Sequence, residues 1–459
     1  MMRPSAGLLV CVGVLAAALD GAAAERPGAA GLGFDAAWQQ LASTSDELRA
    51  SALGVASQRE LADASASLRL PEVTLELRYL NYQKSLEFPL GPLAPVLGPA
   101  GVPDPIELRL DGWRTRPTVT MTLPLYSGGQ IPAAQQAAEA ALRGAQAESL
   151  GTGETLMVVL VRSYFGHQLA ERALAVRAEV LAGLELHLAR AQAFEREGLI
   201  SRAQRLQAQV ARDEAEREFV QARNTLDTAA TQLAALLRLP APVTTATPLF
   251  VLPALPVRQA PSDGSTAASH PRLQRLEALA DQSRAAVKYR EGQLKPQVFA
   301  FGMYDFLRED ALFTEPDWIY GVGLRYALVT GTGRREHLRA ARLQRDQVEA
   351  GMEATRLQLS IATTQAANQA DSARAQFMLL DSALQLASEN VRLQELSFRE
   401  GQATSLDVID ARLGLGRARM QRAQAAYDHV VALAQWLEAR GEARAFATHA
   451  QDPARTIVE

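Results

Sequence analysis

The sequence of 459 residues predicts a mainly α-helical fold with a small β part, built from two tandem repeats of helix, strand, strand, long helix and helix. Two kinds of landmark predict it. A strand ends in a small-residue turn at Gly128 and again at Gly331, and a long helical stretch ends at Gly198 and again at Gly401. Both pairs are 203 residues apart (331 − 128 and 401 − 198). Duplication of a rigid helix, about 100 Å long at ~1.5 Å per residue, explains this common spacing.

The N-terminus has the pattern of a secretory signal peptide, which we predict over residues 1–24. Arg3 precedes an apolar run from Leu8 to Leu19, and the small residues Ala22–Ala24 follow. The run is too short to span a bilayer comfortably as an anchor. Cys11, the only cysteine, lies inside the run rather than after it, which argues against a lipoprotein signal and leaves the mature chain without disulfides.

The first repeat is predicted over residues 25–239. Apolar and polar residues alternate from Val73 to Tyr79, as in a half-buried strand, and again from Thr118 to Leu123. Pro71 ends the preceding helix, and Pro132 suits the first turn of a long one. The expected elements are a helix over 34–70, strands over about 72–80 and 118–126, a Pro- and Gly-rich loop over 81–117, a long helix to 197 with its tip at 198, and a return helix over 201–239.

A linker over residues 240–269 is rich in Pro, Ala, Thr and Ser, and the second repeat is predicted over 270–441. Phe299 and Phe301 interrupt its first strand at positions where alternation predicts polar residues. A polar, flexible tail is expected over 442–459. The expected elements of this repeat are a helix over 270–294, strands over about 297–305 and 318–328, a long helix over 334–400 with its tip at 401, and a last helix over 404–440.

The long helices carry a coiled-coil pattern. From Ala366 to Val391 the apolar residues step by four and three, and the pattern continues from Leu406 to Ala434. Many of these residues are alanine or glycine, so neighbouring helices can approach closely. An ordinary helical bundle would give the same seam, but it would not explain amphipathic strands between the helices.

The strands point to a membrane assembly rather than a single soluble domain. No later stretch is apolar for long enough to be a transmembrane helix. Four strands cannot close a barrel alone, because small barrels need about eight or more, but three copies would supply twelve. Aromatic residues gather near the strand ends, as in the interfacial girdles of outer-membrane barrels. They include Tyr79, Trp113, Tyr304, Trp318 and Tyr320.

Composition argues against several functions. The net charge of −4 and the lack of a dense basic patch argue against a nucleic-acid partner. The six histidines have no metal-binding spacing, so no cofactor is expected. Gly331-Thr332-Gly333 faintly matches a dinucleotide loop, but position 336 is a glutamate, and we do not expect an enzyme.

The chain resembles the outer-membrane efflux protein family, the TolC family. The resemblance rests on an ordered set of segments, namely "LPEVTLELRY", "TLPLYSGGQ", "EGLISRAQRLQAQ", "LKPQVFAFGMY" and "FREGQATSLDVIDARLGL". It implies a homotrimer whose twelve-stranded barrel lies in outer-membrane lipid of a Gram-negative bacterium and continues as an α-helical tunnel into the periplasm. It further implies a tripartite efflux or type I secretion system, with a periplasmic adaptor (membrane fusion) protein and an inner-membrane pump.

The two helix tips are the first candidate site. Glycine at the end of each long helix is expected because a left-handed residue terminates helices. The resemblance adds that the tips dock the adaptor. The matching residues are Gly198, Leu199, Ile200, Ser201, Gly401, Gln402, Ala403 and Thr404.

Asp407 and Asp410 are the second candidate site. They are three residues apart and share one helix face, so threefold symmetry would form two rings of carboxylates that favour cations. Crowding would raise their pKa values and make gating depend on pH. The alternative is that they are first-turn acids favoured by the helix dipole after a Thr404 or Ser405 cap. The resemblance favours a channel constriction.

One departure from the family concerns gate closure. In the best-known member, hydrogen bonds and an ion pair hold the tips shut. The matching positions here are Phe398, Ala403 and Gln204, which lack the hydroxyl, guanidinium and carboxylate of that latch. We therefore expect closure by helix packing and Gln204, and a resting state that opens more easily. The remaining alternative is a soluble periplasmic coiled-coil adaptor, and the sequence leaves the cargo open among drugs, metals and polypeptides.

Overall fold

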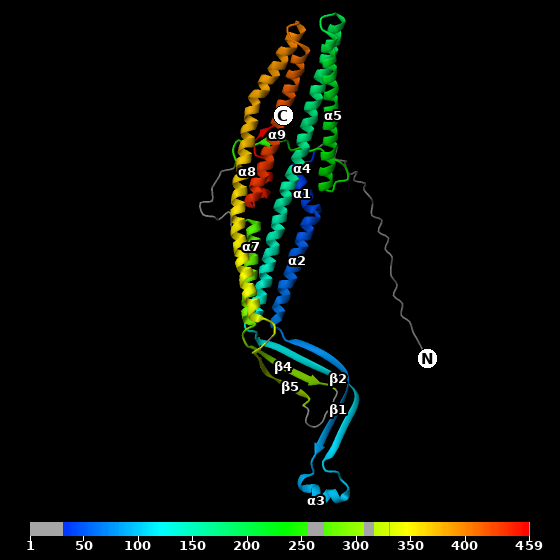
Figure 1. The fold of residues 1–459 in the computed structure, drawn as a ribbon, viewed down its shortest axis with the longest axis vertical. Coiled ribbons are helices and arrows are strands. Elements are labelled where there is room, and N and C mark those ends of the chain that lie inside the picture. The colour runs from blue at the N-terminus through cyan, green and yellow to red at the C-terminus, as the bar shows by residue number, and fades with distance from the viewer. Residues whose placement is uncertain (1–30, 256–269, 307–315, 330, 459) are drawn as a thin grey trace, which may run out of the picture.

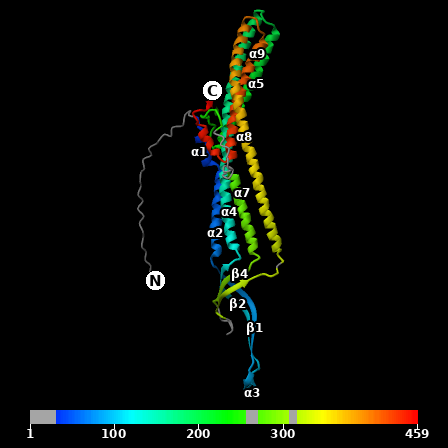
Figure 2. The same cartoon turned by 90° about the vertical axis from the view of Figure 1, so that its left-hand side faces the viewer.

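A computed structural model describes residues 31–255, 270–306, 316–329 and 331–458. The molecule is elongated: helices run side by side along most of its length, and a small sheet lies at one end (Figures 1 and 2). The mainly helical fold with a small β part is confirmed. The predicted signal peptide lies outside the described residues. Among the helices in these ranges, none is both long enough and apolar enough to cross a membrane.

Each half contains one pair of long helices. In the first half the elements are α1 (Phe34–Thr44), α2 (Asp46–Ala66), η1 (Ser67–Arg69), β1 (Glu72–Phe88), η2 (Gly91–Leu93), α3 (Ala94–Leu97), η3 (Gly98–Ala100), β2 (Ile106–Tyr126), α4 (Gln130–Arg196) and α5 (Arg202–Leu236). After them come β3 (Phe250–Val251), α7 (Pro271–Gly292), β4 (Gln297–Asp305), β5 (Trp318–Arg325), α8 (Arg334–Arg399), α9 (Ser405–Arg440), η4 (Ala443–Ala445), α10 (Phe446–His449) and β6 (Thr456–Ile457). The 67 residues of α4 and the 66 of α8 make each about 100 Å long.

The single helix predicted over 34–70 is wrong, because the chain breaks at Ser45. The backbone of Ser45 is extended (φ −69°, ψ 122°), and its Oγ accepts a hydrogen bond from Leu48 N at 3.3 Å. Serine favours such capping positions over helix interiors, since its side chain can satisfy a free backbone N–H. The segment is therefore α1 followed by α2, and only α1 has buried residues.

The loop predicted over 81–117 is also wrong, because most of it is strand. β1 and β2 pair without interruption from Glu72 opposite Thr122 to Phe88 opposite Ile106, well beyond the predicted strands. The alternation of Ile106 and Leu108 with charged residues could have indicated this. Pro117 is accommodated within β2, where its carbonyl accepts a hydrogen bond from Phe306 N at 3.2 Å. Only the tip of the hairpin, around η2, α3 and η3, is non-strand.

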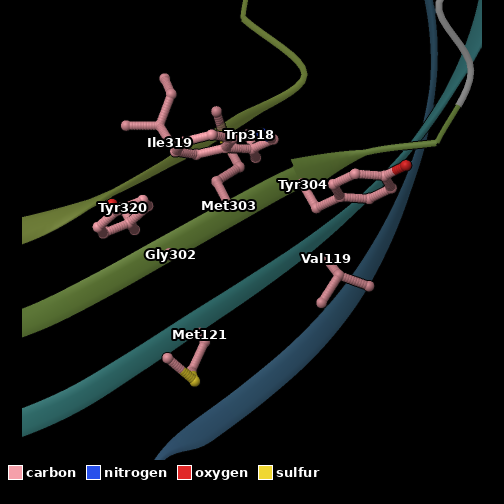
Figure 3. Close-up of a pocket in the computed structure, with 8 residues that line it drawn as sticks. All are labelled: Val119, Met121, Gly302, Met303, Tyr304, Trp318, Ile319 and Tyr320. Atoms are coloured by element: carbon pink, nitrogen blue, oxygen red, sulfur yellow. The ribbon is translucent and has the colours of Figure 1, made fainter.

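The four-stranded antiparallel sheet has the order β1-β2-β4-β5, and its two faces differ in polarity. On one face, which we call the apolar face, Leu75 and Val322 are about 70% exposed. Figure 3 shows a hollow of about 350 Å³ at Gly302, and all of the residues drawn around it except Met303 and Ile319 belong to this face. Other members are Val73, Leu77, Tyr79, Val119, Met121, Tyr304, Trp318, Tyr320 and Leu324.

The opposite face, which we call the polar face, carries hydrogen-bonded side chains. Thr74 and Thr120 hydroxyls lie 2.6 Å apart, and Thr118 Oγ1 donates to Asp305 at 2.5 Å. The two phenylalanines that break the alternation lie here, each over a glycine of the neighbouring strand. A Cβ on Gly323 would lie 2.6 Å from the Phe299 ring, so the glycine makes room for the ring.

The main core lies midway along the helices, where five aromatic rings pack together. Tyr164 at the middle of α4 is its polar centre, since its hydroxyl donates to Leu32 O at 2.5 Å and accepts from Thr247 N at 2.8 Å. This joins the start of the described chain and the segment after α5 to one long helix. The rings are those of Phe34, Tyr164, Phe165, Phe250 and Phe446.

The prediction of a flexible tail over 442–459 is wrong. Ala443, Phe446 and Val458 are buried in the main core, and β6 pairs with β3. Most polar residues of the tail are exposed or half-buried, so its composition conceals the buried apolar residues that hold it.

We expect Phe446→Ala to destabilise the protein by about 3 to 5 kcal/mol, the usual cost of removing a buried phenylalanine ring. The C-terminal segment should then become sensitive to trypsin under conditions where the parent is resistant. Thr448→Ala, at an exposed position two residues away, is the control and should leave the digestion pattern unchanged. Equal digestion of the two variants would contradict the assignment of Phe446 to the core.

Candidate functional site at the helix tips

The two helix tips lie at the same end of the molecule, opposite the sheet (Figure 1). Gly198, with φ 74°, lies in the turn between α4 and α5, which form the first helical hairpin. Gly401, with φ 72°, lies in the turn between α8 and α9, which form the second. In both turns the N–H of the next residue donates to the carbonyl five residues earlier, at 2.8 Å. These are the bonds of a Schellman motif, which needs a left-handed residue and so favours glycine. The two turns are structurally equivalent.

The helices that return from the tips also begin alike, with a capping box in each. Ser201 N donates to Gln204 Oε1 at 3.0 Å, and Thr404 N donates to Asp407 Oδ2 at 2.7 Å. In the reverse direction each cap oxygen accepts from the N–H three residues on, at 3.3 Å. Gln204 and Asp407 are 203 residues apart (407 − 204), so they are equivalent positions of the two repeats.

Asp407 therefore has the capping role that the sequence left open as an alternative. Hydrogen bonds from Thr404 lower the pKa of Asp407 below its ordinary value. Asp410 lies one turn further along α9, and both carboxylates are exposed on the surface of the single chain. The chain brings them to one face of α9 but does not enclose them, so a ring of acids would require further copies.

Gln204 and Phe398 occupy different environments. Gln204 uses its side-chain oxygen in its own cap, at the start of α5, whereas Phe398 is buried. The Phe398 ring lies 5.4 Å from that of Phe194 and 4.8 Å from that of His187, both on α4. Phe398 thus packs the second hairpin against the first, while the capping bonds of Gln204 stay within the first turn of its own helix.

Most of the residues matched to adaptor docking are on the surface. The side chain of Leu199 is 66% exposed. Ile200 instead packs against the small core between the hairpins. The exposed members are Gly198, Leu199, Ser201, Gly401, Gln402 and Thr404, and Ala403 is half-buried.

The sequence did not predict a polar cluster just behind the tips, which we call the tip clasp: His187, Arg190, Glu395, Ser405 and Arg412. His187 Nε2 lies 2.7 Å from Ser405 Oγ. Glu395 pairs with Arg412 and, at 3.5 Å, with Arg190. The clasp joins α4, α8 and α9, which belong to different hairpins.

A glycine makes room for the clasp. A Cβ at Gly183 would lie within 3 Å of the guanidinium of Arg412, so no other residue fits there without moving that side chain. An isolated glycine inside a long helix was the only sequence signal for this site, because glycine disfavours helix interiors unless packing requires it. Ser405, which bonds His187, is 218 residues away in the chain, so no local pattern could identify the contact.

His187 is 1% exposed and lies near two arginines. Burial, followed by the charges of Arg412 and Arg190, lowers the pKa of His187 to about 4, while Glu395 acts in the opposite direction. The imidazole is therefore neutral at neutral pH. Within the part of the chain that the structure describes, no group of three His, Cys, Asp or Glu side chains could hold a metal ion.

The fold and the paired tips define a class of protein in which two long helical hairpins extend from a small sheet with one exposed apolar face. A protein-family model described as "Outer membrane efflux protein" matches residues 37–237 and 264–442. The chain belongs to this family. Comparison with curated protein sequences found no match.

Solved structures share the fold, and the match to each of the following three covers 89% of this chain. CusC superposes with a TM-score of 0.76 at 14% identity over 91% of its own chain. VceC from Vibrio cholerae gives 0.70 at 17% over 96%. The open state of the MtrE channel from Neisseria gonorrhoeae gives 0.70 at 16% over 89%.

Family membership confirms the predicted resemblance and the outer-membrane location. It also confirms that the chain is an efflux protein rather than an enzyme, and it disfavours the soluble adaptor.

We expect the packing of the tips to weaken in acid through His187. The unfolded chain takes up a proton near pH 6.5, whereas the folded chain does so only near pH 4, so stability falls as the pH drops between these values. The loss between pH 8 and pH 5 should be about 2 kcal/mol. Hydrogen exchange of the amides of residues 183–190, corrected for intrinsic exchange, measures it.

His187→Gln should remove this difference, because glutamine can bond Ser405 without titrating. His337→Gln, at an exposed histidine of α8, should retain the wild-type pH dependence. An equal acid effect in the wild type and in His187→Gln would assign the sensitivity to other groups.

Proposed function

We propose that the protein is the outer-membrane tunnel of a tripartite efflux or type I secretion system. It would receive substrates from an inner-membrane pump and conduct them across the periplasm and the outer membrane. The observation that carries this proposal is the continuity of two helices about 100 Å long with a sheet whose apolar face is exposed. A soluble protein has no use for that face.

A homotrimer would complete the assembly. The sheet ends in β1 on one side and β5 on the other, and within the described residues neither edge is paired. Unpaired backbone groups are costly in lipid, so the edges need partners there. Three copies joined edge to edge would close twelve strands, with the apolar face toward lipid and the polar face toward water.

The helices support the same assembly. On α8, Leu379 and Leu386 are 75% and 70% exposed, and Leu393 follows at the same spacing of seven. On α5, Val210 is similarly exposed beside Leu206. A heptad stripe of leucines without a partner in its own chain is typical of a helix that packs against another copy.

The tips would be the place where the periplasmic adaptor docks. They present exposed glycine turns and the side chain of Leu199 at the far end of the molecule from the sheet. The interaction of Phe398 with Phe194 and His187 supports closure by helix packing within each chain. Opening would then require separation of the second hairpin from the first.

Asp407 and Asp410 would line the narrow end of the tunnel. The cap engages Oδ2 of Asp407, so capping and a constriction role are compatible. Around a threefold axis the two residues would form rings that attract cations. Mutual repulsion in the trimer would oppose the lowering of the Asp407 pKa by its cap.

We expect Leu386→Glu to disrupt the trimer, because it buries a charge in an apolar seam. Native mass spectrometry of detergent-purified protein should then show mainly monomers. Gln385→Glu adds the same charge at the adjacent exposed position and should remain trimeric. A trimeric Leu386→Glu protein would place the subunit interface elsewhere.

We expect Asp407→Asn with Asp410→Asn to reduce cation selectivity several-fold in planar-bilayer recordings, because the rings lose six charges per trimer. Glu197→Gln, an exposed acid at the other tip, is the control and should keep the wild-type selectivity. Unchanged selectivity in the double variant would leave the aspartates with capping alone. A chain recovered in the soluble fraction without conductance would favour the adaptor.

A further inference from the structure

The β1–β2 hairpin extends far beyond the rest of the sheet. Asp305 at the end of β4 pairs with Thr118, and Trp318 at the start of β5 pairs with Tyr304. The segments 81–88 and 106–113 therefore pair only with each other among the described residues. We call them, with the turn between them, the hairpin extension. It projects from the sheet at the end away from the helices (Figure 1).

Its polarity is the reverse of that of the sheet. Within the sheet, opposed pairs such as Leu75 and Val119 are apolar on one face, and pairs such as Thr74 and Thr120 are polar on the other. In the extension the opposed apolar pairs are Leu86 with Leu108 and Phe88 with Ile106. These even-numbered residues of β1 continue the polar face, because the register has no shift.

The apolar face changes in the opposite sense. Beyond Tyr79 it continues with polar and charged residues, which are Asn81, Gln83, Ser85 and Glu87 on β1 and Asp111, Arg109 and Glu107 on β2. A strand alternates its side chains between two faces, so this exchange cannot arise from a turn of the ribbon alone. The apolar residues have moved from one face to the other, with one charged exception on the second face, Lys84 opposite Leu110.

The apolar residues change faces at the position of Tyr79 and Trp113 along the hairpin. The rings of Tyr79 and Trp113 stack there with centroids 5.0 Å apart, on the apolar face. Such aromatic residues mark the boundary between lipid and water in outer-membrane barrels. Gly112, the residue before Trp113, has φ 124°, which glycine tolerates far better than other residues. The hairpin formed by β1 and β2 is curved (Figure 1).

The extension leaves apolar groups exposed where water is expected. Phe88, Leu108 and Ile106 are 46%, 44% and 40% exposed, although they share one face of a two-stranded ribbon. Two strands alone are marginally stable in water, so that face needs a cover. Leu93 and Val96 at the tip are exposed as well.

We infer that the extensions of the three copies pack together through this face and cap the outer mouth of the pore. The occupant is a second copy because the face continues the pore-lining side of the sheet, and a threefold axis brings three identical faces toward each other. The charged side, with Glu107 and Arg109, stays in water. This inference rests on the proposed trimeric tunnel, and its pore would be closed by an apolar constriction.

Cysteine cross-linking at neighbouring positions tests the cap. Leu108→Cys and Arg109→Cys place one thiol on either face, in a Cys11→Ser background where no other cysteine exists. Purified trimers are treated with a short bismaleimide and separated on a denaturing gel. We expect cross-linked dimers from Leu108→Cys at several times the yield from Arg109→Cys.

The outcomes separate the cap from the tunnel. Leu108→Cys trimers that fail to cross-link, or that do no better than Arg109→Cys trimers, would overturn the cap and leave the tunnel standing. Native mass spectrometry of the same samples establishes that they are trimers. If the parent protein itself is not trimeric, both the proposed tunnel and the cap are overturned.

Discussion

The structure depends on the close approach of very long helices through small side chains. Helices of this length are stabilised mainly by packing, so contact must continue along all of their length. On α4, Ala133, Ala140 and Ala147 are buried at intervals of seven. Nearer the tip, a Cβ on Gly416 of α9 would lie 2.7 Å from Cγ2 of Val180. A larger residue at Gly416 would push α9 away from α4 and so separate the two hairpins near the tips.

Because the two hairpins are duplicates, both tips have the same capping interactions. Sequence divergence then distinguishes one tip from the other. Gln204 and Asp407 make the same capping box, yet one is an amide and the other a carboxylate. The fold needs only an acceptor at this position, so charge is free to vary there. The second hairpin therefore carries an acid at this position, and Ser405 at the start of α9 also bonds His187 on the first hairpin.

Local rules were enough to predict the long helices from the sequence. The ends of α4 and α8 agree with prediction within a residue or two, because glycine turns and capping residues signal them. Prediction failed where a local signal was outweighed. Proline and glycine concealed the strands around Gly112, polar composition concealed the burial of Phe446, and one serine divided α1 from α2. The tip clasp has no local signal, since His187 and Ser405 meet only through tertiary packing.

The two ends of the proposed tunnel would close by different physics. At the tips, a neutral buried histidine and an ion pair join the hairpins of one chain, and protons act directly on such groups. At the outer mouth, the pairs around Leu86 and Leu108 are apolar, so their contact does not depend on the titration of a side chain. Such an apolar constriction would open when cargo separates the three faces. Because the two closures share no titrating group, opening at one end need not open the other. A passing substrate would then meet a regulated entrance and an unregulated exit.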